Sequence, residues 1–325
     1  MNKKQNLIKK KKSNNEKGRE TKENLLKPKI DVVFHSLFRE GNEGITKALI
    51  SSVIKEKIND IKLDNDRYVF GKYPEEKLGI LDLKATLGDG KICDVEIQLV
   101  DNKDTEARFL YYWSRIYSSQ LTKGNIYKDL NKVIGIIILD FPLEKTKALE
   151  NICTEWKITE VTTGLNLVLT EMLQIYIIEI SKAKRTLEKE PNNELAQWVL
   201  FLDNPNQEEV FKAMETNKEL KEAMKNLDEI SQQEELRRVA ELREKAIMDE
   251  KNALTHALED GKKEGLKKGM EIGRAEGKAE GQILGKKETQ KEIAKKMLEK
   301  DFSIEEIQSL IPLSQDEIEK LKANI

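Results

Sequence analysis

The stretch that decides the fold is GILDLKATLGDGKICDVEIQLV, which runs from Gly79 to Val100. Apolar and polar residues alternate on both sides of Gly88-Asp89-Gly90, which predicts two antiparallel strands joined by a tight turn. Because successive side chains of a strand lie on opposite faces, one face of this hairpin is apolar and is expected to pack on the core. The apolar face consists of Leu81, Leu83, Ala85, Leu87, Cys93, Val95, Ile97 and Leu99.

The other face of the hairpin sets carboxylates against each other. With the turn centred on Asp89, Asp82 lies opposite Glu96, and Lys84 follows opposite Asp94. Facing side chains are about 5 Å apart at Cβ, so Asp82 and Glu96 repel unless one is protonated or a cation lies between them. A hard divalent ion such as Mg²⁺ suits two such carboxylates. A solvent-facing strand also alternates polar and apolar residues, so the pattern alone leaves both interpretations open.

The segments around the hairpin predict a compact α/β unit. Apolar spacing over residues 31–57 indicates two helical pieces that are split at a Gly-Asn-Glu-Gly turn. Strands are expected over residues 62–73 and 79–99. The short β-branched run KVIGIIILDF is typical of a strand that is buried on both faces. The remaining elements expected are a helix over 104–122 and strands over 132–141 and 171–180.

Composition limits the classes of function. Charged residues make up 36% of the 325 residues and hydrophobic residues 38%, which indicates solvated helix beside a packed domain. The net charge is −2, so attraction to nucleic acid must come from local patches. Cys93 and Cys153 lack CxxC or histidine neighbours, so we expect thiols in a reducing compartment. Because His35 and His256 are the only histidines, a structural zinc site and a Ser-His-Asp triad lack support.

No secretory signal is recognisable at the basic start of the sequence. The longest apolar run, Val133–Leu139, is far shorter than a membrane span. We therefore expect a cytoplasmic protein with no membrane partner. Five segments are expected: a basic disordered tail (1–29), an α/β domain (30–185), a helical region (186–260), a glycine-repeat helix or spacer (261–288) and a small helical module (289–325).

Two of these segments leave alternatives open. The tail holds eleven Lys or Arg against three Glu, which suits either a solubilising arm or loose contact with DNA phosphates. In the repeat every fourth residue is glycine, and each interior glycine costs a helix about 1 kcal/mol relative to alanine. The repeat is therefore either a flexible spacer or a stripe that packs against a second helix. In the last segment, capping-box patterns begin at Ser303 and Ser314.

The hairpin resembles the core of a known nuclease superfamily. Asp82, thirteen intervening residues and then Glu96-Ile97-Gln98 are similar to the D…(D/E)-x-K pattern of the PD-(D/E)XK nucleases. Longer segments are similar to the Rpn family of recombination-promoting nucleases, which are also described as transposases. These segments are KIDVVFHSLF, GILDLKA, DVEIQLV, RFLYYWSRIYSSQLTKGNIYKDL, VIGIIILDF, LQIYIIEISK, ELAQWVLFL and the glycine repeat.

The resemblance implies a PD-(D/E)XK-like fold, αβββαβ with a mixed sheet flanked by helices, followed by a helical C-terminal region. It also implies a metal-dependent DNA endonuclease that promotes recombination, with DNA as partner and Mg²⁺ or Mn²⁺ as cofactor. Carried over to this chain, Asp82 and Glu96 hold the metal, and Asp31 before the first helix completes its shell. Gln98 takes the place of the superfamily's lysine and can hold a water or a phosphate oxygen.

Two departures from the family pattern concern positive charge. His35 replaces the lysine usual in the first-helix segment, and Gln98 cannot carry the charge that a lysine brings to the transition state. Lys84, two residues along the strand from Asp82, is one candidate for the missing charge, and the alternative is that it pairs with Asp94 across the hairpin.

The helix over 104–122 offers further cations. Its aromatic stripe at positions i, i+3, i+4 and i+7 is typical of a face that packs on a core. Arg108, Arg115 and Gln120 fall off that stripe and are candidates for contact with DNA phosphates, but the sequence does not choose among them. The stripe consists of Phe109, Tyr112, Trp113 and Ile116.

Three functional hypotheses therefore compete. The first is a magnesium-dependent DNA endonuclease. The second is a catalytically degenerate interaction or scaffold protein on a nuclease fold, which forms a homo-oligomer through its C-terminal helices. The third is a mobile-element transposase. Dependence of DNA cleavage on a divalent metal separates the first from the second.

Overall fold

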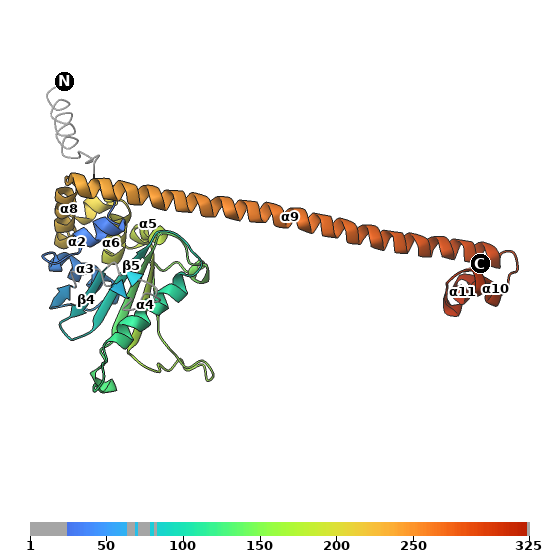
Figure 1. Ribbon diagram of the computed structural model, residues 1–325, viewed down its shortest axis with the longest axis horizontal. Helices are drawn as coiled ribbons and strands as arrows, with labels where there is room; N and C mark the ends of the chain where they lie inside the picture. Colours follow the sequence, from blue (N-terminus) through green and yellow to red (C-terminus); the bar gives the residue numbers. More distant parts are fainter. Residues whose placement is uncertain (1–24, 64–68, 71–78, 81–82, 324–325) are drawn as a thin grey trace, which may run out of the picture. The chain divides into compact units, whose positions relative to one another are not determined.

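The computed structural model describes residues 25–63, 69–70, 79–80 and 83–323. Contacts divide the chain into two compact units, Met1–Lys251 and Asn252–Ile325. The first unit contains a mixed sheet with helices on both faces, and it is shown in Figure 1. The expected α/β class with a mixed sheet flanked by helices is confirmed.

The main sheet has six strands in the order β1-β4-β5-β6-β8-β7. Strands β5, β6 and β8 are parallel, whereas β1, β4 and β7 are antiparallel to their neighbours. The carboxyl ends of the three parallel strands therefore meet at one edge of the sheet. The strands are β1 (Ile61–Leu63), β4 (Leu83–Leu87), β5 (Ile92–Gln98), β6 (Val133–Leu139), β7 (Cys153–Trp156) and β8 (Leu173–Glu179), with a separate pair β2 (Val69–Phe70) and β3 (Gly79–Ile80).

The hairpin of β4 and β5 has the predicted register. Lys84 pairs with Asp94 and Leu83 pairs with Val95. The turn contains Gly90 with φ of +85°, a left-handed conformation that favours glycine. The described apolar face is buried in the main core, as predicted, and it consists of Leu83, Ala85, Leu87, Cys93, Val95 and Ile97.

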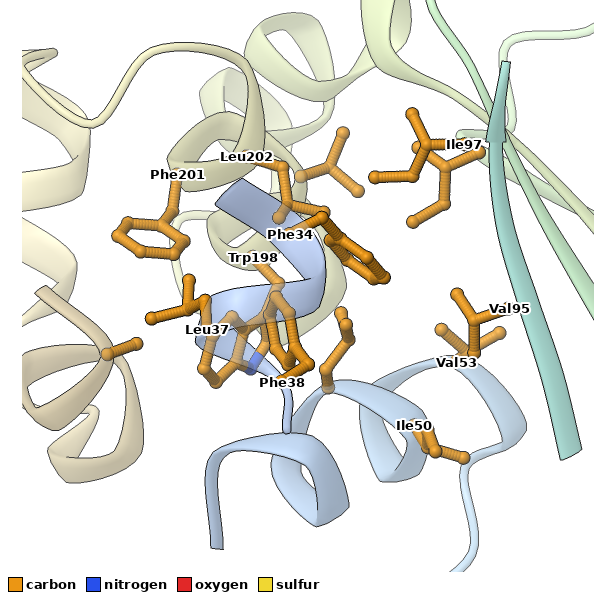
Figure 2. Close-up of a cluster of buried hydrophobic side chains, with 14 of the residues drawn as sticks. Phe34, Leu37, Phe38, Ile50, Val53, Val95, Ile97, Trp198, Phe201 and Leu202 are labelled. Atoms are coloured by element: carbon orange, nitrogen blue, oxygen red, sulfur yellow. The ribbon is translucent and has the colours of Figure 1, made fainter. Parts of the chain in front are cut away.

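One face of the sheet is covered by several helices that form the main core. Figure 2 shows Phe34 of α2 and Phe38, which directly follows α2, together with Trp198 of α6 and Val95 of β5 in this core. The ring centroids of Phe38 and Trp198 lie 6.3 Å apart. The helices of the first unit are α2 (Asp31–Leu37), α3 (Glu43–Ile54), α4 (Thr105–Ser119), α5 (Ala183–Lys189), α6 (Glu194–Asp203), α7 (Glu208–Ala213) and α8 (Lys218–Ser231), with 3-10 turns at Tyr127–Asp129, Glu144–Thr146 and Ile180–Lys182.

The opposite face of the sheet is covered by α4. Its predicted aromatic stripe is buried, and the indole N–H of Trp113 donates to the carbonyl oxygen of Val133 at 3.0 Å. Every residue of β6 is buried because helices pack on both of its faces. Phe109 lies directly against Gly135, where an added Cβ would come within 2.2 Å of its ring. Glycine at this position therefore lets α4 approach the sheet closely.

The first unit extends further along the chain than the boundary expected at residue 185. Helices α6 and α8 contribute Leu195, Phe201 and Leu227 to the same core as α2 and β5. They pack on α2 and α3 in this core, so they belong to the α/β unit rather than to a separate helical region. The short edge strand β7 was not expected from the sequence, because CTEW is mostly polar and partly exposed.

Helix α9 (Glu234–Leu298) runs from the first unit into the second. In the first unit its Ala240 is buried and its Ile247 packs on the core. In the second unit α10 (Ile304–Leu310) and α11 (Gln315–Lys322) begin at the predicted capping boxes of Ser303 and Ser314. They pack on the end of α9 in a small cluster that includes Ala294.

The glycine repeat is helical throughout and lies within α9. At each of its glycines an added Cβ would meet no atom within 4 Å, so nothing in the described part of the chain packs on the stripe. The choice between a spacer and a self-association surface remains a prediction. Among the described helices, none combines the length and the apolar character needed to cross a membrane.

Candidate active site

A cavity of about 330 Å³ lies at the carboxyl end of β5, the edge where open α/β sheets commonly bind their ligands. Four parts of the chain line it: the start of α2, the end of β5, the start of α4 and the first turns of α9. All four lie within the first unit. The lining residues with polar chemistry include Asp31, His35, Glu96, Gln98, Arg108 and Arg243.

Asp31 reaches this cavity because it is the first residue of α2. Its Oδ1 is buried and has no hydrogen-bond partner among the described residues. Its Oδ2 lies 3.6 Å from Nε of Arg243, which comes from α9 more than two hundred residues later. A buried carboxylate oxygen normally has a partner, so this oxygen marks a position that suits a cation or an ordered water.

Glu96 and Gln98 lie two residues apart on the face of β5 opposite the main core. Glu96 is only 2% exposed, because β5 is a central strand and α4 covers this face. Gln98 is half-buried at the end of the strand, and its carbonyl oxygen accepts a hydrogen bond from the amide of Asp140 at 2.9 Å. The strand thus holds both polar side chains at the cavity on a rigid backbone.

The structure brings together three of the sequence-predicted site residues, Asp31, Glu96 and Gln98. Asp82 lies outside the described residues. Within the described ranges no group of three or more His, Cys, Asp or Glu side chains is arranged to hold a metal. Three described carboxylates line the cavity, those of Asp31, Glu96 and Glu250. The place of Asp82 at the site stays a prediction.

Lys84 occupies a different position from these residues. It lies on β4 directly opposite Asp94 in the hairpin register, and it is not among the residues that line the cavity. Asp94 is fully buried beneath α4. This geometry favours the cross-strand pairing of Lys84 over a role beside Gln98.

The cavity also contains cations that the sequence did not single out. Lys29 donates to Asp203 at 2.7 Å and to Asp140 at 3.0 Å. Burial opposes the charge of Lys29, but the hydrogen bond to Asp203 and the charge of Asp140 outweigh it, so its pKa is raised. Arg243 gave no sequence signal, because it stands in a long charged helical run where neighbouring residues look alike.

A larger cavity of about 860 Å³ lies elsewhere in the first unit, lined by parts of α3 and α5. Its Glu150 is paired with Arg185 and Lys189, and none of the sequence-predicted site residues lines it. The smaller cavity is the better candidate site, because it gathers the predicted site residues and contains a buried carboxylate oxygen that has no hydrogen-bond partner in the described part of the chain.

A protein-family model described as PD-(D/E)XK nuclease family transposase matches residues 28–257, which include every residue that lines the smaller cavity. The chain belongs to this family. The match agrees with the resemblance to the Rpn nucleases and supports a nuclease-like or transposase-like function. No curated protein and no solved structure matches the chain.

PD-(D/E)XK nucleases generally use divalent metal ions. The donors at this family member's cavity fit such an ion, since Asp31, Glu96 and Gln98 all present oxygen. Mg²⁺ is commonly bound by one or two carboxylates, with the remaining positions filled by water or substrate phosphate. The buried Oδ1 of Asp31 is an acceptor that such an ion would satisfy.

Proposed function

We propose that this PD-(D/E)XK family member is a metal-dependent DNA endonuclease whose cuts promote recombination. The observation that supports the proposal most directly is the meeting of Asp31, Glu96 and Gln98 at one cavity. Asp31 comes from α2, whereas Glu96 and Gln98 come from β5, and each was expected at the site from the family pattern. DNA is the substrate that the family indicates.

The chain's own residues have distinct parts in this reaction. Asp31 and Glu96, with Asp82, would hold the metal ion. When bound, a divalent ion polarises the phosphodiester and lowers the pKa of the attacking water. Gln98 positions that water or a phosphate oxygen through hydrogen bonds from its side-chain amide. Because β5 is fixed between β4 and β6, these groups hold their positions without reorganising during the reaction.

The test is nicking of supercoiled plasmid during titration with Mg²⁺ and with Mn²⁺. We expect cleavage that stops with EDTA and is lost in Asp82→Asn and Glu96→Gln. Each of these substitutions removes a charge while nearly preserving side-chain volume. Asp31→Asn should raise the metal concentration needed for half-maximal cleavage, because it removes the charge but keeps one oxygen donor.

Glu106→Gln is the matched control, since it removes a carboxylate from the first turn of α4 outside this cavity. It should cut like the unmodified chain. Cleavage that persists without added metal, or that survives in Glu96→Gln, would contradict the proposal. DNA binding without cleavage at any metal concentration would instead favour the scaffold hypothesis.

A further inference from the structure

Cleavage at this site needs a positive charge that the family pattern does not supply. In the superfamily a lysine stands at the position of Gln98, and the amide of Gln98 is neutral. The phosphate of DNA gains negative charge as water attacks it, so a cationic hydrogen-bond donor beside the metal would stabilise the transition state. The structure offers three candidates at the cavity, namely Lys29, Arg108 and Arg243.

Two of these three cations already have carboxylate partners. Lys29 is shared between Asp140 and Asp203, which hold it where β6 and α6 end. Arg243 lies 3.6 Å from Asp31 and faces a carboxylate that is proposed to hold the metal. Both are therefore occupied in neutralising negative charge within the protein.

Arg108 is in a different situation. Its guanidinium lies 5.4 Å from the ring centroid of Tyr112, one turn further along α4, which holds the planar group through a cation–π contact. No carboxylate forms an ion pair with Arg108 among the described residues. Its Nε is buried and lacks a hydrogen-bond acceptor there.

A buried hydrogen-bond donor without an acceptor costs free energy of folding. Such a donor therefore needs an explanation, and an acceptor supplied by a bound ligand is one. Arg108 lines the same cavity as Glu96 and Gln98. A guanidinium presents a fork of N–H groups that matches the oxygens of a phosphate. The buried Nε–H of Arg108 and the buried Oδ1 of Asp31 both lack hydrogen-bond partners among the described residues, and both residues line one cavity. A site for a phosphate and a cation requires such a donor and such an acceptor.

We propose that Arg108 contacts the backbone phosphate of bound DNA and supplies the positive charge that Gln98 lacks. This inference rests on the proposed nuclease function and assigns a phosphate-binding residue within it. Tyr112 acts as a positioning residue, because its ring fixes the guanidinium while its own side chain stays buried in the α4 stripe.

The first test compares single-turnover cleavage of a linear duplex by the unmodified chain and five variants. Arg108→Gln should cut about 100-fold more slowly, the loss typical of removing one transition-state donor. Arg108→Lys should retain part of the rate, because it keeps the charge without the planar fork. Adding Gln98→Lys to Arg108→Gln should restore cleavage, with Gln98→Lys alone as the reference. Arg115→Gln removes the same charge from α4 away from the cavity and should cut normally.

The second test measures binding of a fluorescent duplex by anisotropy, with Ca²⁺ in place of Mg²⁺ and over a range of salt concentrations. One lost phosphate contact lowers the slope of log affinity against log salt by about 0.9. Arg108→Gln should show this decrease, and Arg115→Gln should keep the original slope. Thermal melting of each variant shows whether the fold is preserved.

The outcomes separate the two proposals. If the unmodified chain cuts DNA and Arg108→Gln has unchanged rate and slope, the assignment of Arg108 is overturned while the nuclease function stands. A slow Arg108→Gln variant with unchanged slope and no rescue by Gln98→Lys would mean a structural role and would also overturn it. If the unmodified chain binds DNA without cutting it, the proposed nuclease function is refuted. The change in the salt-dependence slope of Arg108→Gln then shows by itself whether Arg108 contacts a phosphate. If it neither binds nor cuts, both proposals fail.

Discussion

Gly135 shows how a single residue lets α4, which lines the candidate site, pack closely on the sheet. It lies on β6 beside Asp94 in the parallel register, on the face that α4 covers. The ring of Phe109 occupies the space where a side chain at this position would stand. Because Arg108 is the neighbour of Phe109, the distance between α4 and the sheet also sets the place of the proposed phosphate contact.

We therefore expect Gly135→Ala to destabilise the first unit by about 1–3 kcal/mol, the usual cost of overpacking a core. The new methyl group would lie 2.2 Å from Cζ of Phe109, so the ring or the whole helix must move. Thermal and urea unfolding measure the loss. Gly44→Ala on α3 is the matched control, because its added Cβ meets no atom within 4 Å. Equal stability of the two variants would contradict this packing argument.

At the scale of the element, the end of the chain shows how local sequence signals fix a small helical module. The hydroxyl oxygens of Ser303 and Ser314 each accept a hydrogen bond from the backbone N–H of the glutamate three residues later. The backbone N–H of each serine in turn donates to the carboxylate of that glutamate. Glu317 also forms an ion pair with Lys287 of α9 at 2.7 Å. That hydrogen bond, together with those from Ser314, lowers the pKa of Glu317 to about 2.

This lowered pKa predicts an acid-sensitive helix α11. A carboxyl whose folded-state pKa lies below its unfolded value of 4.5 stabilises the fold above that value, and this contribution is lost as pH falls toward about 2. Titration of the Glu317 carboxyl by NMR measures the pKa directly. The temperature at which the NMR methyl signal of Ile318 is lost should fall as the pH falls from 4.5 toward about 2. This pH dependence should be smaller in Glu317→Gln and unchanged in Glu305→Gln. An unshifted titration would refute the expectation.

At the scale of the whole molecule, the family match and the contact boundary nearly coincide, at residues 257 and 251. The helix between residues 234 and 251 completes the first unit, because Ala240 is buried in its core and Arg243 faces Asp31. The rest of α9, with the glycine repeat, belongs to the second unit.

We expect a chain that ends at residue 257 to keep its thermal stability and to cut DNA, whereas one that ends at residue 232 should lose both. The shorter chain lacks Ala240 and Arg243, so it exposes part of the core and leaves Asp31 without its cation. Light scattering of the full and the 257-residue chains gives their masses. Fewer chains per particle after truncation would show that residues 258–325 associate. The same number of chains per particle would identify the repeat as a spacer.

Much of the hairpin could be predicted from the sequence. The period-2 alternation around Gly88-Asp89-Gly90 has only one register that buries every apolar residue, since a shift by one residue would exchange the faces. Lys84 opposite Asp94 followed from this arithmetic. The buried run of β6 and the caps at Ser303 and Ser314 were also local signals, and the structure confirms them.

The sequence by itself thus determined the β4–β5 hairpin with its register, the buried strand β6 and the nuclease family pattern around Glu96. Only the tertiary structure decided which side chains surround this carboxylate. Asp31, Arg108 and Arg243 meet it because α2, α4 and α9 pack around the carboxyl end of β5. Local periodicity specifies which face of each helix is buried, but not which neighbour that face meets. The cations of the site depend on that long-range packing.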